Sequence, residues 1–236
     1  MVIEFSNRMV TFFLVALALA ALYFAIDETR RRANLGLVKL AWVQVAGIFG
    51  QALLGGVTVL TKLNPLPVAG HFLLSMALIA GAVALVIKSR PVEEFAPVRS
   101  EVRRLNSLLV LIAALVITLG TLVTGSGPHA GDATAKRFGF DPRTVSFLHA
   151  DMVIAFCGLT LAMWLALRLT HADRRLINSA QLVLASIIIQ GAIGYTQYFT
   201  KLPEALVAVH LLGADVVWIS TCLLYARVKR AGVETD

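Results

Sequence analysis

The chain is a succession of long apolar stretches separated by short segments that hold most of its charged residues. Seven stretches are long enough to cross a bilayer, because a spanning helix needs about 20 mostly apolar residues. They are residues 3–26, 37–60, 67–87, 105–125, 146–168, 178–199 and 204–226. The strict apolar–polar alternation of a membrane β-barrel is absent. The pattern therefore predicts an all-α polytopic membrane protein with seven transmembrane helices.

Composition agrees with this prediction. Of the 236 residues, 58% are hydrophobic and only 15% are charged, which is typical of integral membrane proteins. Both cysteines, Cys157 and Cys222, fall inside predicted spans. A role as small buried apolar residues is therefore favoured over a disulfide or a c-type heme attachment.

The basic residues are unevenly distributed among the connecting segments. Fifteen of the twenty-one Lys and Arg residues lie in 27–39, 88–104, 168–177 and the tail from Arg227. The positive-inside rule makes these segments cytoplasmic, so the N-terminus is outside and the C-terminus inside. The net charge of +7 is then explained by topology and lipid headgroups, and nucleic acid is not an expected partner.

One segment occurs twice. Residues 51–72, QALLGGVTVLTKLNPLPVAGHF, align without a gap with residues 190–211, QGAIGYTQYFTKLPEALVAVHL, at an offset of 139 residues. Such repeats commonly pack about a pseudo-twofold axis. The offset suggests a unit of four helices, which predicts a 4+4 arrangement whose first helix would precede Met1. We expect an N-terminal half-bundle at 1–88, a cytoplasmic linker at 89–104 and a C-terminal half-bundle at 105–236.

Three histidines lie inside predicted spans near the outer face. They are His71, His149 and His210, and the first and last are related by the repeat. Ionisable groups inside a bilayer are costly and usually have a partner or a function. Each ring could be a neutral hydrogen-bonding group between helices, or an axial ligand of heme iron. Several glycines nearby would either let helices approach or leave room for a flat macrocycle; they are Gly47, Gly50, Gly55, Gly56, Gly191 and Gly194.

The two halves differ at the position that corresponds to His149. Asn7 occupies the place in the first half where a histidine would be expected. Asparagine is a poor ligand of heme iron, so the C-terminal half would be bis-histidine and the N-terminal half would have one strong ligand. Glu4 shares a helix face with Asn7. It would serve as a base or a stabiliser of positive charge, or only complement the helix dipole.

These features resemble the heme A synthases of the bacterial plasma membrane and the mitochondrial inner membrane, and the GSGPHAGD loop is most similar to the actinobacterial branch. The matching segments span nearly the whole chain; they are 3–8 (IEFSNR), 51–78, 120–132 (GTLVTGSGPHAGD), 148–151 (LHAD) and 190–214. The resemblance implies eight transmembrane helices in two four-helix halves. It also implies oxidation of the C8 methyl of heme O to the formyl group of heme A, which cytochrome oxidases use.

The resemblance also implies residue roles. His149 and His210 would bind a resident heme b, and His71 would bind the iron of the substrate heme O. Glu4 would be the catalytic glutamate. Asn7 stands where many members have a histidine, and would contact the substrate. Arg8 lies on the outer side, where it would pair with a heme propionate of the substrate or serve only as an interface anchor.

Two further histidines and two lysines complete the candidates. His129, in the loop after residue 125, is expected to be solvated rather than bound to a propionate. His171, at the cytoplasmic end of the fifth span, has no assigned role. Lys62 and Lys201 lie on the outer side, as interface anchors or propionate partners.

The expected partners are membrane lipid and an electron acceptor such as a quinone, with heme O synthase and a second copy of the chain as further candidates. Two other functions use the same residues. An electron-transfer cytochrome would need the histidines but not Glu4. A transporter built on a repeat would place its site near the midplane, whereas these histidines lie near one face.

Overall fold

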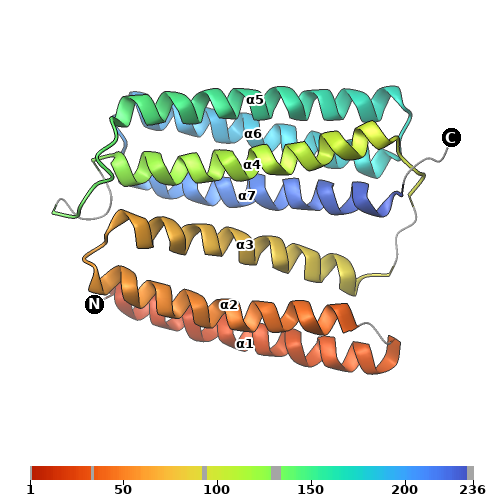
Figure 1. Ribbon diagram of the computed structural model, residues 1–236, viewed down its shortest axis with the longest axis horizontal. Coiled ribbons are helices and arrows are strands. Elements are labelled where there is room, and N and C mark those ends of the chain that lie inside the picture. The colour runs from red at the N-terminus through yellow and green to blue at the C-terminus, as the bar shows by residue number, and fades with distance from the viewer. Residues whose placement is uncertain (1, 33–34, 92–94, 129–133, 233–236) are drawn as a thin grey trace. The chain divides into compact units, whose positions relative to one another are not determined.

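The computed structural model describes residues 2–32, 35–91, 95–128 and 134–232, and the side chains of residues 2–8, 31, 32 and 35 lie outside this description. Within it the chain forms seven α-helices (Figure 1). They are α1 (Val2–Arg32), α2 (Leu35–Leu60), α3 (Pro65–Ser89), α4 (Ser100–Ser126), α5 (Pro142–Leu169), α6 (Arg174–Phe199) and α7 (Glu204–Arg230). All seven are long and apolar enough to cross a membrane, which confirms the predicted class.

Several helices extend beyond the apolar stretches that predicted them. Helix α4 begins at Ser100, inside a segment expected to be a loop, and α7 continues to Arg230. Past the apolar region the backbone continues its own hydrogen bonds, and charged side chains reach solvent. Arg227, Lys229 and Arg230 in the last turn of α7 also interact favourably with the negative end of the helix dipole.

Three helices begin at residues that satisfy the free N–H groups of a first turn. The side chain of Asn64 accepts a hydrogen bond from the Leu66 amide at the start of α3. Asp141 and Asp173 do the same for Thr144 in α5 and Arg175 in α6. The hydroxyl of Thr144 also donates to Asp141, and these bonds lower the pKa of that carboxyl.

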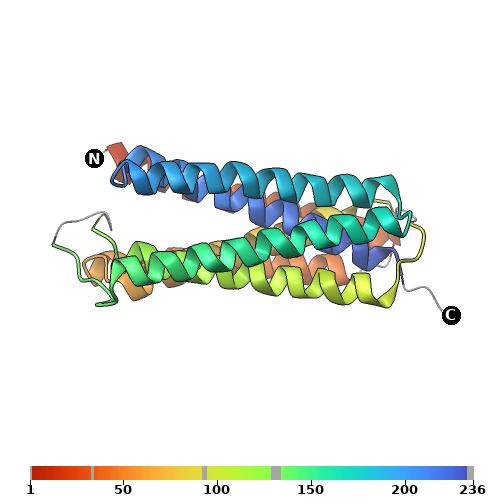
Figure 2. The same ribbon diagram turned by 90° about the horizontal axis from the view of Figure 1, so that it is seen from above.

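The chain forms two compact units, Met1–Pro91 and Val92–Asp236. In the first unit α2 packs against both α1 and α3. The hydrophobic core of this unit lies between α1 and α2. The buried residues of that core are Ala18, Leu22, Ala25, Leu37, Ala41 and Val45. In the second unit the four helices alternate in direction, and each packs against two others (Figures 1 and 2).

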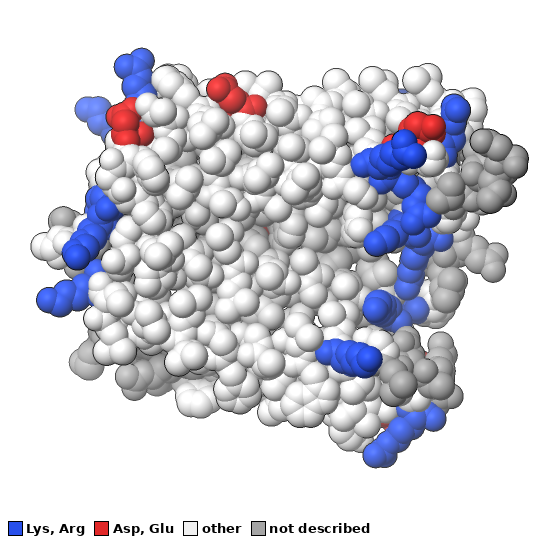
Figure 3. Space-filling model, in the orientation of Figure 1, with Lys and Arg blue, Asp and Glu red and all other residues white. Residues whose placement is uncertain are grey.

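The surface has the polarity of a membrane protein. Large apolar side chains such as Leu53, Leu169 and Phe199 are 75% or more exposed. On the face shown in Figure 3, Lys and Arg side chains gather at the helix ends. Each unit has two ends, which we name separately. In the first unit the basic end is the one at Ser89 and the histidine end is the one at Leu60. In the second unit the basic end is the one at Ser100 and Arg230, and the histidine end is the one at Phe199.

The two copies of the repeat end their first helix in the same way. After α2, Lys62 and Leu63 have positive φ angles of 53° and 56°; after α6, Lys201 and Leu202 have 64° and 60°. The amides of Leu63 and Leu202 both donate to a carbonyl five residues earlier, at Thr58 and Gln197. This is the C-terminal cap that usually carries glycine. The hairpins α2–α3 and α6–α7 thus share a backbone turn as well as a sequence.

We predict that Lys201→Gly stabilises the α6–α7 turn, because glycine adopts φ near +64° without steric cost. The gain should be at most about 1 kcal/mol, since left-handed residues cost about 1–2 kcal/mol and glycine loses more entropy on folding. Thermal unfolding in detergent measures it. Thr200→Gly, at φ −92°, is the matched control and should destabilise. A lower unfolding temperature for Lys201→Gly than for Thr200→Gly would show that the turn is not strained.

Candidate functional site

The second unit is packed with side chains at its basic end and less tightly filled at its histidine end. Its buried residues run from the basic end up to Ala113 on α4, Phe156 on α5, Ile187 on α6 and Trp218 on α7. No residue is buried on α4 between Ala113 and Thr121, or on α5 between Val145 and Phe156. Nearer the histidine end, Thr121, Gly125 and Ser126 on α4 and Val145 on α5 are buried again. The packed core is therefore interrupted part-way along the bundle.

His149 and His210 lie on the histidine side of this interruption. His149 is the eighth residue of α5, and His210 is the seventh residue of α7. Both are partly buried, and they lie toward the same end of the same four-helix unit. The fold thus brings together the two histidines that the sequence predicted as ligands of one heme. His71 occupies the corresponding position on α3 of the first unit.

Each of the three histidine rings lies against a glycine of the helix that packs beside it. A Cβ atom at Gly55 on α2 would be 3.4 Å from Cε1 of His71, and one at Gly120 on α4 would be 3.4 Å from Cε1 of His149. At Gly194 on α6 it would be 3.1 Å from Cε1 of His210. The same edge of each ring, Cε1 with Nδ1, faces the glycine. The rings therefore lie nearly on the backbone of the neighbouring helix.

The two nitrogens of each ring have different surroundings. Nδ1 of His149 is 3.1 Å from the carbonyl oxygen of Val116, one turn before Gly120. Nδ1 of His71 and of His210 is fully enclosed and has no hydrogen-bond partner among the described residues. None of the three Nε2 atoms is among the enclosed atoms of the described residues, or hydrogen-bonded to any of them. Nε2 is thus the nitrogen free to bind a ligand.

This arrangement fits a heme group. A neutral imidazole that binds iron through Nε2 carries its proton on Nδ1, and a carbonyl oxygen such as that of Val116 accepts it. Within the described residues no cluster of three or more His, Cys, Asp or Glu side chains could enclose a metal ion. Heme iron needs only one or two protein ligands, since the macrocycle supplies the others. Because each glycine has no side chain, the ring beside it can lie directly against the neighbouring helix.

Other predicted residues lie elsewhere or outside the description. The side chains of Glu4, Asn7 and Arg8, on the first turns of α1, are not described, and neither is His129. His171 follows α5 at the basic end, far along the helix from His149, with φ 51°.

Sequence reasoning missed two features of the site. Gly120 and the Val116 carbonyl were not singled out, although Gly120 lies in a matching motif. Gly194 was noted as small, but its contact with a ring depends on helix packing, which a single sequence does not specify.

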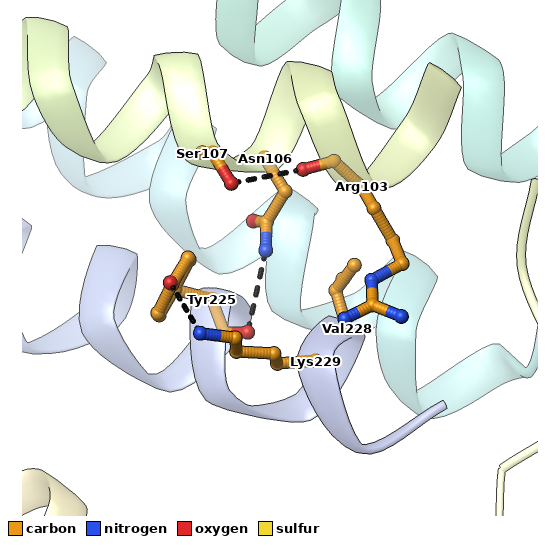
Figure 4. A pocket seen from close by; sticks show the side chains of 6 residues that line it. All are labelled: Arg103, Asn106, Ser107, Tyr225, Val228 and Lys229. Carbon is orange, nitrogen blue, oxygen red and sulfur yellow. Dashed lines mark hydrogen bonds between the residues drawn. The ribbon is translucent and has the colours of Figure 1, made fainter. Parts of the chain in front are cut away.

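A small pocket lies at the basic end of the second unit, between α4 and α7 (Figure 4). Two hydrogen bonds link its side chains to Tyr225: Asn106 donates to the Tyr225 carbonyl at 3.3 Å, and Lys229 donates to the Tyr225 hydroxyl at 3.0 Å. It is lined by Arg103, Asn106, Ser107, Tyr225, Val228 and Lys229. It contains no histidine, and we assign it no role in the site.

The comparison with known proteins identifies the family. Residues 1–222 match COX15-CtaA, described as cytochrome oxidase assembly protein. The chain belongs to this family. No curated protein sequence gives a significant match. Membership confirms the resemblance to heme A synthases. It also supports a multi-pass membrane protein, in agreement with the seven apolar helices.

We predict that Gly194→Ala weakens the site whereas Gly191→Ala does not. A methyl at residue 194 would meet the His210 ring, while the space at residue 191 is open. Overpacking costs about 1–3 kcal/mol, whereas alanine in an unobstructed helix gains about 0.5–1 kcal/mol over glycine. Thermal unfolding of the two purified variants measures the difference. Equal unfolding temperatures would mean that the ring does not pack against Gly194.

Proposed function

We propose that this protein is a heme A synthase, which oxidises the C8 methyl of heme O to a formyl group for cytochrome oxidase assembly. The observation that carries the proposal is the placement of His149 and His210 toward the end of one four-helix unit where the packed core is interrupted, with Nε2 of each ring free. Family membership supports the reaction class. The proposed cofactor is heme b, bound by these two residues, and the proposed substrate ligand is His71.

The chain's own groups would hold the cofactor in a fixed orientation. Val116 accepts the Nδ1 proton of His149, so the ring presents Nε2 and cannot rotate without losing that bond. Gly120 and Gly194 set the distance between each ring and the adjacent helix. Heme b, when bound, supplies an electron-transfer site. Low polarity around the rings excludes water, since the surrounding spans are apolar.

In the first unit, His71 would bind the substrate iron, and Glu4 would act at the substrate. Turning a methyl into a formyl group adds one oxygen atom, which water would supply, and removes four electrons and four protons from the substrate and that water, so an electron acceptor such as a quinone is required. A carboxylate at the outer end of α1 would stabilise positive charge there or accept a proton. Asn7 and Arg8 would contact the substrate. The proposed orientation, in a bacterial plasma membrane, places the histidine end outside and the basic end in the cytoplasm.

We predict that His149→Ala and His210→Ala each lower heme b per chain more than about tenfold. Even the residues that only hydrogen-bond to a metal ligand change metal affinity by about 10–100-fold, and loss of the ligand itself should cost more. The pyridine hemochrome assay on detergent-purified protein measures this. His171→Ala is the matched control and should keep the wild-type heme content. Wild-type heme b content in both site variants would contradict the ligand assignment.

Glu4→Gln separates the synthase from an electron-transfer cytochrome. We predict that the variant keeps its heme b spectrum but produces no heme A in cells that make heme O. Chromatography of extracted hemes measures the product, and Glu28→Gln, on the same helix at the basic end, is the control. Wild-type heme A production by Glu4→Gln would remove Glu4 from the mechanism. No heme A from the wild-type chain, together with bound heme b, would favour the cytochrome.

A further inference from the structure

A polar contact one turn from each glycine–histidine pair has no place in the function described so far. Nε2 of Gln190 on α6 donates a hydrogen bond to the backbone carbonyl of His210 on α7, at 2.7 Å. Nε2 of Gln51 on α2 donates to the carbonyl of His71 on α3, at 3.1 Å. Each glutamine lies four residues, one helical turn, before the glycine that its histidine ring contacts. The same contact therefore occurs in both units.

Each unit provides space or a partner for this amide. In the second unit a Cβ atom at Gly213 would overlap Oε1 of Gln190. The Gln190 side chain therefore occupies space that is available only because residue 213 is glycine. In the first unit Gln51 also donates to the hydroxyl of Ser75, which itself donates to the His71 carbonyl at 3.0 Å. In both units the glutamine amide thus reaches the backbone carbonyl oxygen of the histidine, although its other neighbours differ.

Stability does not account for these glutamines. A buried hydrogen bond shifts a folding equilibrium by about fivefold, whereas an enclosed acceptor left unpaired opposes folding by about five- to 150-fold. Oε1 of Gln51 and Oε1 of Gln190 are both enclosed and have no hydrogen-bond partner among the described residues. The amide of Gln190 therefore costs at least as much as its one bond contributes, and the amide of Gln51 costs about as much as its two bonds contribute. We expect an apolar residue at position 190 to fold equally well or better, and one at position 51 to fold about equally well.

The bond acts on the backbone of the residue that carries the ring. The carbonyl of His210 is held from α6 at the level just below the ring, and Gly194 contacts the ring one turn further. Together the two contacts fix the height of α7 along α6 and the rotation of the ring. His149 is held differently, through its own Nδ1 atom and Val116.

We propose that Gln190 and Gln51 are positioning residues for the histidine ligands. Each amide holds the carbonyl of its histidine, so that the imidazole plane is presented to the iron at one angle. This inference rests on the proposed function, because it takes His210 and His71 to be heme ligands. It predicts that the glutamines determine the ligand-field geometry of the heme rather than the stability of the bundle.

The test uses two variants that remove the same contact in different ways. Gln190→Leu deletes the amide, and Gly213→Ala displaces it while leaving the glutamine in the chain. Gln181→Leu is an exposed glutamine change on the same helix, and Gly158→Ala is a glycine change where nothing lies within 4 Å. Heme b per chain, the g-values of the ferric heme by electron paramagnetic resonance, and thermal unfolding of the heme-depleted protein are measured for each.

We expect Gln190→Leu to unfold at or above the wild-type temperature, yet to bind heme b about fivefold more weakly, the equivalent of one hydrogen bond. Its largest g-value should shift, because the g-values of low-spin ferric heme depend on the angle between its two imidazole planes. Gly213→Ala should shift the g-value in the same direction. Both controls should give the wild-type spectrum.

Three results would overturn the proposal, and they are distinguishable. If the wild-type chain holds heme b and neither variant changes its g-values, the positioning role is wrong although the function stands. If Gln190→Leu fails to unfold cooperatively while Gly213→Ala keeps the wild-type spectrum, the glutamine is structural. If the wild-type chain holds no heme b, the proposed function fails and this inference fails with it.

Discussion

The contact of an imidazole ring with a glycine on the antiparallel neighbouring helix is the interaction on which the site depends. It occurs as Gly55–His71, Gly120–His149 and Gly194–His210. A side chain on the partner helix would push the ring away and tilt the helices apart, because packed interiors have little free space. Beside Gly120 the exposed helix backbone also provides an acceptor, the Val116 carbonyl, for the second nitrogen of His149.

The two ends of the second unit differ in how tightly their side chains are packed. Toward the basic end, Leu109, Met163, Leu176 and Leu224 are fully buried and hold the second unit together. Toward the histidine end the inward positions are less tightly filled. A flat apolar cofactor would complete that end of the core, so heme binding and folding of the second unit are expected to be coupled.

Much of this was predictable from the sequence, and what was not has a physical reason. Apolar stretches predicted all seven helices, because a bilayer imposes a minimum length and forces internal backbone hydrogen bonding. Helix ends were predicted less well, as at Ser100, because charged turns continue a helix beyond the apolar region. The histidines were found by their unusual location. Gly120, Gly213 and the Val116 carbonyl were not, since their roles depend on which helix faces which.

The most direct test of the central claim is the electron paramagnetic resonance spectrum of the purified ferric protein, produced in cells that make heme b but not heme O. Only the resident site would then be filled. The account predicts one heme b per chain with the low-spin signal of two imidazole ligands. A high-spin signal at the same stoichiometry, or absence of heme from a folded chain, would contradict the assignment of His149 and His210 as ligands of one iron.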